Sequence, residues 1–193
     1  MDIIRSSELI ETPWKNGGGV MWEIAGASLN GKSMCRLSLA DVTRNGPFSD
    51  YAGQVRILTV IKGEGMVLES NEWTLHAKPF SPVRFSGALK IQACLYAGAS
   101  TNLNLMFDPA HCDCKVTILH GPCQQTLNPD SDQIFALHGL AGTSTFSLNA
   151  RLDPDDTALI NSNSHQITLA DNAAALLVTI CPERQSDIQL TRV

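Results

Sequence analysis

The stretch best suited to ligand chemistry is the segment Pro13 to Gly19, which reads Pro-Trp-Lys-Asn-Gly-Gly-Gly. Three successive glycines weaken any regular element, and they are tolerated where the backbone needs a positive φ or where another group approaches closely. The lysine, the amide and the bare backbone N–H groups could bind a small anion. A plain glycine-rich turn with Trp14 as a core anchor fits the same residues. It is not a phosphate-binding loop, because Lys15 precedes the glycines.

A second group of polar residues lies in segments that alternate like β-strands. Arg36 and Ser38 share one face of residues 34–41, and Asn102, Asn104 and Met106 share one face of residues 102–107. If these faces line a barrel interior, the arginines would pair bidentately with a carboxylate ligand. If they face solvent, the arginines are ordinary surface cations, and strand register decides between the two. The candidate ligand-binding residues are Lys15, Asn16, Gly17, Gly18, Glu23, Arg36, Ser38, Arg56, Asn102 and Asn104.

Metal and nucleophile signatures are weak in this sequence. No two of the five histidines are spaced i, i+2 or i, i+4, the spacing usual for metal sites in jelly-roll barrels. The run His111-Cys112-Asp113-Cys114 lacks the second ligand pair of a zinc site. There is no Gly-x-Ser-x-Gly motif, no cysteine has an obvious catalytic base near it in sequence, and the thiols of the His111–Cys114 run are interpreted as incidental. We therefore expect no metal, no cofactor and no catalytic residues.

Composition excludes several classes of partner. The 193 residues are 44% hydrophobic and 17% charged, with a net charge of −5 and no basic tract, so we expect no nucleic acid partner. Residues 1–11 lack the apolar core of a signal peptide. The longest strongly apolar run, residues 173–181, is too short to span a membrane. We expect a cytoplasmic protein with no membrane partner, whose six cysteines stay reduced.

The elements that must position these residues are short strands. Turn signals such as Asn30-Gly31 and Asn45-Gly46-Pro47 separate β-rich runs, and no segment of eleven or more residues has helical periodicity. A weak internal repeat relates residues 57–68 to residues 134–146. Each copy is followed by a proline-containing break and then by a strong strand, at residues 89–96 and 174–181. This pattern predicts an all-β protein made of two jelly-roll units.

The order of these motifs resembles the HutD/Ves family. After Pro-Trp-Lys-Asn-Gly-Gly-Gly come Glu23-Ile24-Ala25, Arg36-Leu37-Ser38-Leu39-Ala40-Asp41-Val42, Gly46-Pro47-Phe48-Ser49, Gly63-Glu64-Gly65-Met66 and Asn102-Leu103-Asn104-Leu105-Met106. The resemblance covers about residues 10–107. Cys35 stands where the family usually has tryptophan, and Asn102 replaces its usual aspartate.

The resemblance implies a bicupin, with two stacked jelly-roll barrels in one chain and without the usual cupin metal ligands. We expect an N-terminal barrel at residues 1–110, with the glycine segment, and a C-terminal barrel at residues 111–193. Some family members are encoded with histidine-degradation genes and are thought to bind an intermediate such as formylglutamate or urocanate; others are linked to stress responses.

We therefore expect a metal-free bicupin that binds a carboxylate-bearing metabolite, with a regulatory or stress-related role. One alternative is a cupin-type enzyme, a lyase, isomerase or dioxygenase, with an atypical metal site. Another is an interaction module, such as a homodimer joined by sheet edges.

Overall fold

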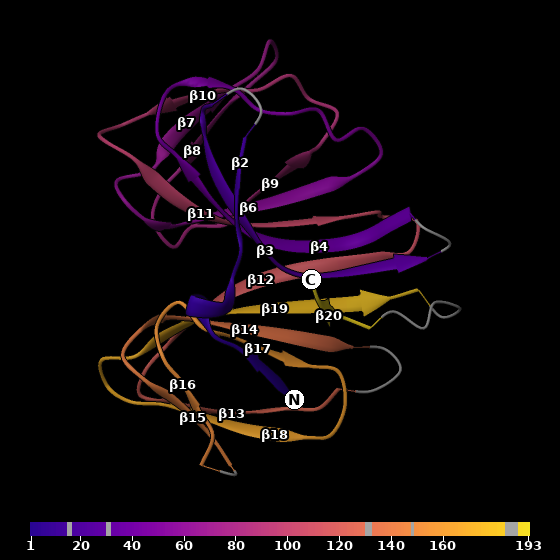
Figure 1. Cartoon of the computed structure of the whole chain (residues 1–193), viewed down its shortest axis with the longest axis vertical. Coiled ribbons are helices and arrows are strands. Elements are labelled where there is room, and N and C mark those ends of the chain that lie inside the picture. The colour runs from indigo at the N-terminus through magenta and orange to yellow at the C-terminus, as the bar shows by residue number, and fades with distance from the viewer. Residues whose placement is uncertain (15–16, 30–31, 130–132, 148, 184–188) are drawn as a thin grey trace. The chain divides into compact units, whose positions relative to one another are not determined.

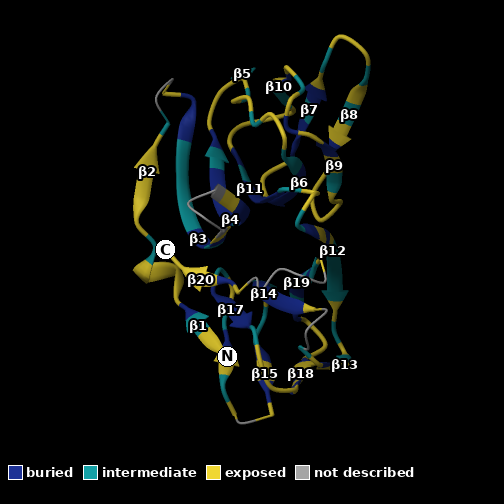
Figure 2. Ribbon diagram, turned by 90° about the vertical axis from the view of Figure 1, so that its right-hand side faces the viewer, coloured by how far each residue is buried: buried dark blue, intermediate teal, exposed yellow. Residues whose placement is uncertain are grey.

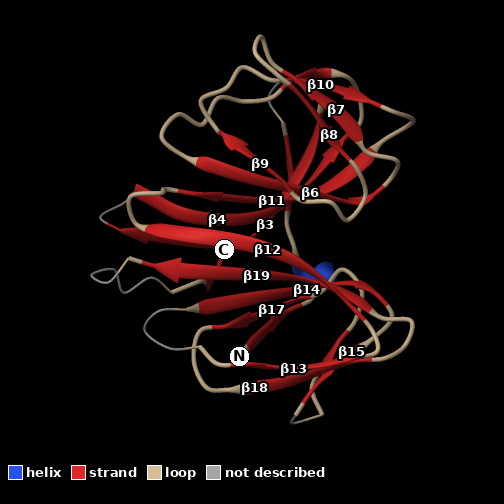
Figure 3. Cartoon of the chain, turned by 180° about the vertical axis from the view of Figure 1, so that it is seen from behind, coloured by secondary structure: helices blue, strands red, loops and turns tan. Residues whose placement is uncertain are grey.

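The chain is almost entirely β-structure, as predicted. The structure is a computed structural model that describes residues 1–14, 17–29, 32–129, 133–147, 149–183 and 189–193. Within these ranges the one helix is a short 3-10 turn, η1, at Ser6–Glu8, and the remaining regular structure is strand (Figure 3). The described part of the chain contains no helix with the length and apolar character needed to cross a membrane.

The chain divides into two compact units (Figure 1). Ile10–Pro109 forms the N-terminal barrel, and Met1–Leu9 with Ala110–Arg192 forms the C-terminal barrel. The first nine residues were expected in the N-terminal barrel. They belong to the C-terminal one, because β1 (Asp2–Ile4) pairs antiparallel with β17 (Thr157–Ile160). Arg5 strengthens this attachment, since its Nη1 donates to Oδ2 of the buried Asp156 at 2.7 Å.

The N-terminal barrel consists of two antiparallel sheets. The larger sheet has the order β2-β3-β4-β11-β6-β9, and the smaller sheet has the order β5-β10-β7-β8. The strands are β2 (Glu11–Pro13), β3 (Gly19–Leu29), β4 (Lys32–Val42), β5 (Gly46–Pro47), β6 (Val55–Lys62), β7 (Met66–Glu69), β8 (Thr74–Ala77), β9 (Val83–Ser86), β10 (Gln92–Leu95) and β11 (Ser100–Phe107).

The C-terminal barrel also has two sheets, with the orders β1-β17-β14-β19-β12 and β13-β18-β15-β16. The further strands are β12 (Cys112–His120), β13 (Cys123–Leu127), β14 (Ile134–Ala141), β15 (Ser144–Phe146), β16 (Arg151–Leu152), β18 (His165–Leu169), β19 (Ala174–Pro182) and, near the end of the chain, β20 (Thr191–Arg192).

Both barrels have the same jelly-roll topology. Adding eight to each label of β4-β11-β6-β9 and β5-β10-β7-β8 gives β12-β19-β14-β17 and β13-β18-β15-β16. The two predicted jelly-roll units are therefore confirmed. The internal repeat is confirmed where residues 57–68 fall on β6 and β7 and residues 134–146 on β14 and β15. Its last part is wrong by one strand, because β10 is the equivalent of β18, whereas residues 174–181 belong to β19, the equivalent of β11.

The central strands of the larger sheets carry most of the buried side chains. β6 and β14 are buried along nearly their whole length, while the edge strand β8 is largely exposed (Figure 2). The core of the N-terminal barrel is formed by Val42, Leu58, Val60, Met66, Leu68, Ala77, Phe85, Ile91 and Ala93. Alternation along these strands places one set of side chains inside the barrel, as it does in any sheet with one buried face.

Both barrels have the same irregularity of strand pairing, and it shows which residues of one barrel correspond to which residues of the other. The register between β6 and β11 shifts between Thr101 and Asn102, and the register between β14 and β19 shifts in the corresponding place. Counting from these shifts, Arg56 is the equivalent of Phe135, and Asn104 is the equivalent of Leu177. Phe135 and Leu177 belong to the apolar core of the C-terminal barrel. The N-terminal barrel thus has polar groups where its counterpart is filled with hydrocarbon.

Candidate functional site

Three neighbouring strands bring two arginines into one row. Arg36 on β4 and Arg56 on β6 both pair with Met106 on β11, the strand between them. Directly paired residues of antiparallel strands project from the same face of the sheet. Asn104 pairs with Ser38 two residues further along β11, so both share this face as well. Strand pairing therefore gathers four of the predicted residues on one surface.

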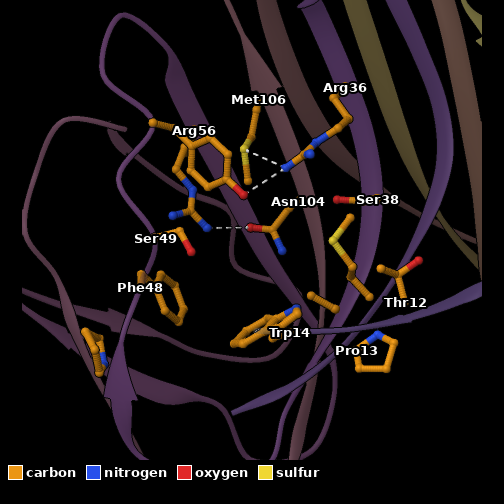
Figure 4. Close-up of a pocket in the computed structure, with 14 residues that line it drawn as sticks. Thr12, Pro13, Trp14, Arg36, Ser38, Phe48, Ser49, Arg56, Asn104 and Met106 are labelled. Carbon is orange, nitrogen blue, oxygen red and sulfur yellow. Dashed lines mark hydrogen bonds between the residues drawn. The ribbon is translucent and has the colours of Figure 1, made fainter. Parts of the chain in front are cut away.

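These residues line a cavity of about 460 Å³ in the N-terminal barrel. Figure 4 shows the two guanidinium groups toward one end of the cavity and the ring of Trp14 toward the other, and Phe48 contacts both Arg56 and Trp14. The predicted polar face therefore lines the barrel interior instead of facing solvent. The lining residues are Thr12, Pro13, Trp14, Met21, Arg36, Ser38, Ala40, Pro47, Phe48, Ser49, Tyr51, Arg56, Asn104 and Met106.

Arg56 is a buried cation with few polar partners. Arg56 is only 6% exposed, and its Nη2 donates to Asn104 Oδ1 at 3.2 Å. Its Nε has no hydrogen-bond partner. Aromatic rings surround the guanidinium: its Cζ lies 5.0 Å from the centroid of Phe48, 5.2 Å from Phe85 and 5.5 Å from Tyr51. Each such cation–π contact stabilises a cation modestly, by about 0.5–2 kcal/mol.

Burial lowers the pKa of Arg56 to about 10. The electrostatic interaction with Tyr51 raises this pKa, and charge repulsion from Arg36 lowers it further. The guanidinium nevertheless remains protonated at neutral pH. The lowered pKa indicates that the cavity holds this charge at a cost, which a bound anion would offset.

Tyr51 lies between the two arginines. Arg36 Nη2 donates to the Tyr51 hydroxyl at 3.2 Å, and Arg36 Cζ lies 5.3 Å from the Tyr51 ring centroid. The loop that carries Tyr51 is held against Gly87, because the Tyr51 N–H donates to Gly87 O at 2.9 Å. A Cβ on Gly87 would lie 2.4 Å from Tyr51 O, so only glycine permits this approach.

The two arginines have no acidic partner in the described residues. The ion pairs of the described chain lie elsewhere, for example between Arg5 and Asp156, and none involves Arg36 or Arg56. Burying an uncompensated cation costs several kcal/mol even after relaxation. An anionic ligand placed between the guanidinium groups would supply the missing charge.

Hydrogen-bond chemistry makes this end of the cavity rich in donors. Arginine has no acceptor, so Asn104 must turn its carbonyl oxygen toward Arg56. The Asn104 Nδ2 then remains as a donor toward the cavity, as Figure 4 shows. Together with Arg36 and Arg56, it favours a ligand that only accepts hydrogen bonds. A carboxylate meets this requirement.

The glycine segment serves mainly to position Trp14. The Gly17 N–H donates to Trp14 O at 2.9 Å, and the Trp14 N–H donates to Gly19 O at 3.0 Å. The Gly17 N–H is therefore occupied within the glycine segment, and Gly17 is not among the residues that line the cavity. Trp14 packs edge-on against Phe48, with ring centroids 6.5 Å apart, and lines the cavity while it contacts the core. Lys15 and Asn16 lie outside the described residues.

Three further predicted residues lie away from the cavity lining. Asn102 is fully buried beside Ala40, and its Nδ2 donates to Ala40 O at 3.5 Å. Glu23 pairs with Ser38 next to a register shift in β3, and it is half-buried without lining the cavity. Gly18 is engaged through its carbonyl, which accepts from the Thr43 N–H. Alternation along β11 places Asn102 on the same face as Asn104, but Asn102 is fully buried and does not line the cavity.

Sequence reasoning missed the aromatic part of the site. Phe48 and Tyr51 come from the loop that follows β5, where no strand alternation reveals a direction. The signal that could have found them is the pair of aromatic residues beside Gly46-Pro47 and Gly53 in an otherwise polar loop. Met106 was recognised on the face of Asn104, but its thioether was not considered as part of a site.

The described residues form no cluster of three or more His, Cys, Asp or Glu side chains that could hold a metal ion. What the arrangement can do is bind: two cations, an amide donor and hydroxyls converge at one end of an aromatic-walled cavity. Its volume lies within the range of about 300–1,000 Å³ that is usual for small-molecule sites.

Comparison with known proteins agrees with the architecture. The chain is similar to HutD from Pseudomonas fluorescens SBW25 (formate condition), with a TM-score of 0.82 and 26% identity, over 94% of this chain and 98% of that one. It is also similar to the conserved protein PA5104 from Pseudomonas aeruginosa PAO1, with a TM-score of 0.81 and 25% identity, over 93% and 97% of the two chains.

One sequence relative is described by its place beside another gene. It is an uncharacterized 21.2 kDa protein in the hutC 3′ region of Pseudomonas putida, 37% identical over 113 residues. That alignment spans 56% of this chain and 59% of the relative's length. The HutD family model matches residues 6–178, which include most of both barrels. The chain therefore belongs to the HutD family, and its two jelly-roll barrels have the cupin fold.

Proposed function

We propose that the N-terminal barrel binds a small carboxylate-bearing metabolite and that this binding has a regulatory role. The observation that carries the proposal is the pair of inward-facing arginines, Arg36 and Arg56, that have no acidic partner in the described chain. A charged carboxylate would accept hydrogen bonds from both guanidinium groups and from Asn104. Such charge-assisted bonds are about twice as strong as neutral ones.

Electrostatics favours this reading over an empty, purely structural cavity. Two unit charges about 4 Å apart attract by about 4 kcal/mol at the effective dielectric constant typical of protein sites. An anion near both guanidinium groups gains from each and removes the repulsion that helps to lower the Arg56 pKa. The aromatic end, with Trp14 and Phe48, would cover the remainder of the ligand.

The family relationship supports a ligand from histidine degradation. The relative in the hutC 3′ region and the resemblance to HutD both point to histidine utilisation. The intermediates formylglutamate and urocanate each carry a carboxylate. The structure of the Pseudomonas fluorescens HutD is described as a formate condition. That description applies to the Pseudomonas protein, but formate is the simplest carboxylate and so belongs to the proposed class of ligand.

The test is ligand-dependent thermal stability with a panel of formylglutamate, urocanate, glutamate, formate and unrelated acids. A ligand present at about one hundred times its dissociation constant should stabilise the protein by about 2.7 kcal/mol. Arg56→Ala should abolish the shift. The matched control is Arg84→Ala, because Arg84 pairs with Ile57 on β6 and so projects from the opposite face of the same sheet.

A selective shift that Arg56→Ala removes and Arg84→Ala retains would support the proposal and name the ligand class. If no acid in the panel stabilises the protein, or if Arg56→Ala binds with unchanged affinity, the proposed site is wrong.

A further inference from the structure

Met106 occupies an unusual place for a thioether. It pairs with Arg36 on one side and with Arg56 on the other, and it lines the cavity. Arg36 Nη2 contacts the Met106 Sδ at 3.5 Å. A thioether sulfur is a weak acceptor, so it leaves most of the hydrogen-bonding capacity of the two guanidinium groups unused.

Oxidation would change this balance. The sulfur lone pair attacks one oxygen of hydrogen peroxide, the O–O bond breaks, and the departing hydroxide takes up the proton left on the new S–OH group. The products are methionine sulfoxide and water, so the sulfur loses two electrons and the peroxide gains them. The sulfoxide oxygen is polar and accepts hydrogen bonds, unlike the thioether it replaces.

We infer that Met106 is an oxidation site that switches off the anion site of the N-terminal barrel. The new oxygen lies within reach of the Arg36 guanidinium, takes up donors that a carboxylate needs, and fills part of the space between the two arginines. The inference rests on the proposed carboxylate binding and adds its regulation. Reduction of the sulfoxide by a methionine sulfoxide reductase restores the site.

Strand pairing separates Met106 from the other methionines, because it lies directly between two arginines. Met106 is 4% exposed and lines the cavity, whose volume of about 460 Å³ exceeds that of a peroxide molecule many times over. Met21 lines the same cavity from β3, where it pairs with Ala40 and not with an arginine. Met66 is fully buried in the core, and Met1 is 38% exposed. Met66 and Met1 therefore serve as internal references for protected and accessible sulfur.

The experiment treats the full-length protein with hydrogen peroxide and follows each methionine by peptide mass mapping. Carboxylate binding is measured before and after treatment with formate and formylglutamate as probes. We expect oxidation of Met106 to weaken binding by at least about tenfold, because hydrogen bonds to charged groups are lost. Bound formylglutamate should slow oxidation of Met106, and reductase treatment should restore binding.

Two variants make the assignment specific. Met106→Leu has a similar volume and no sulfur at this position, so the carboxylate affinity that this variant has before peroxide treatment should be the same after it. Met21→Leu should lose affinity as the unmodified protein does. Both variants retain all six cysteines, so thiol oxidation is the same in each.

The inference is overturned if Met106 is oxidised without loss of binding, if it stays reduced when Met1 and Met21 are oxidised, or if Met106→Leu loses affinity equally. Failure of the proposed function looks different, because then the untreated protein binds neither probe.

Discussion

Arg36 and Arg56 flank Met106 on the two strands that neighbour β11, so that two like charges share one cavity wall with a thioether between them. In the described residues neither guanidinium has a carboxylate partner, and Tyr51 contacts both. The equivalent row of the C-terminal barrel is Lys115, Thr179 and Phe135, in which Phe135 is part of an apolar core. One topology thus supports a packed interior in one barrel and a charged cavity in the other.

Replacing Arg56 by methionine should separate stability from binding. Without ligand, Arg56→Met should unfold with a free energy equal to that of the unmodified protein or about 1 kcal/mol above it, because an uncompensated buried charge is removed. Stabilisation by a carboxylate should disappear. Chemical denaturation with and without formylglutamate measures both effects. A large loss of stability without ligand would mean that Arg56 is a structural residue.

The hydroxyl and the ring of Tyr51 should contribute separately. Tyr51→Phe keeps the ring beside both guanidinium groups but loses the hydrogen bond from Arg36, so carboxylate affinity should fall by about threefold to tenfold. Tyr51→Leu also loses the cation–π contacts and should bind more weakly still. Isothermal titration of the two variants checks the order. Equal affinities for Tyr51→Leu and the unmodified protein would exclude this role.

Gly19 should tolerate no side chain. A Cβ there would lie 1.8 Å from the carbonyl oxygen of Asp41, and the Gly19 carbonyl also accepts from the Trp14 N–H. Gly19→Ala should therefore lower the free energy of unfolding by at least about 2 kcal/mol and displace Trp14 from the cavity. The matched control is Gly46→Ala, since a Cβ at Gly46 meets nothing within 4 Å. Comparable melting temperatures for both variants would contradict the expected clash.

His165 should make the protein less stable in mild acid. Burial lowers its pKa from the ordinary value of 6.5, the charged amino terminus lowers it further, and a backbone hydrogen bond with Ser162 opposes the shift. Below that ordinary value the unfolded chain binds more protons at this histidine than the folded chain does. Stability from this group is therefore present above pH 6.5 and is lost as the pH falls below it.

The variant His165→Phe removes the titrating group and retains an aromatic ring beside Phe146, whose centroid lies 6.3 Å from that of His165. Its loss of unfolding free energy between about pH 7.5 and pH 5.5 should be smaller than that of the unmodified protein. His120→Gln, at an exposed position on β12, should behave like the unmodified protein. The same pH dependence in all three proteins would rule out His165 as the source.

Local sequence determined the strands and the faces of their side chains. Alternation has a period of two residues, so Arg36 and Ser38 had to share one face, and so did Asn102, Asn104 and Met106. Turn residues and the absence of helical periodicity were enough for an all-β prediction, and motif order indicated the family. These properties depend on neighbours in the chain, and a single sequence contains that information.

Only the tertiary structure decided which face lies inside, how deep each residue sits and which loops complete the site. β4, β11 and β6 come from distant parts of the chain, and their register places Arg36 and Arg56 opposite Met106 while it buries Asn102 beside Ala40. A slip of one residue would have turned the arginines outward. The loop of Phe48 and Tyr51 is held at the cavity by backbone hydrogen bonds to Ile91 and Gly87, which are contacts between segments that no local pattern encodes.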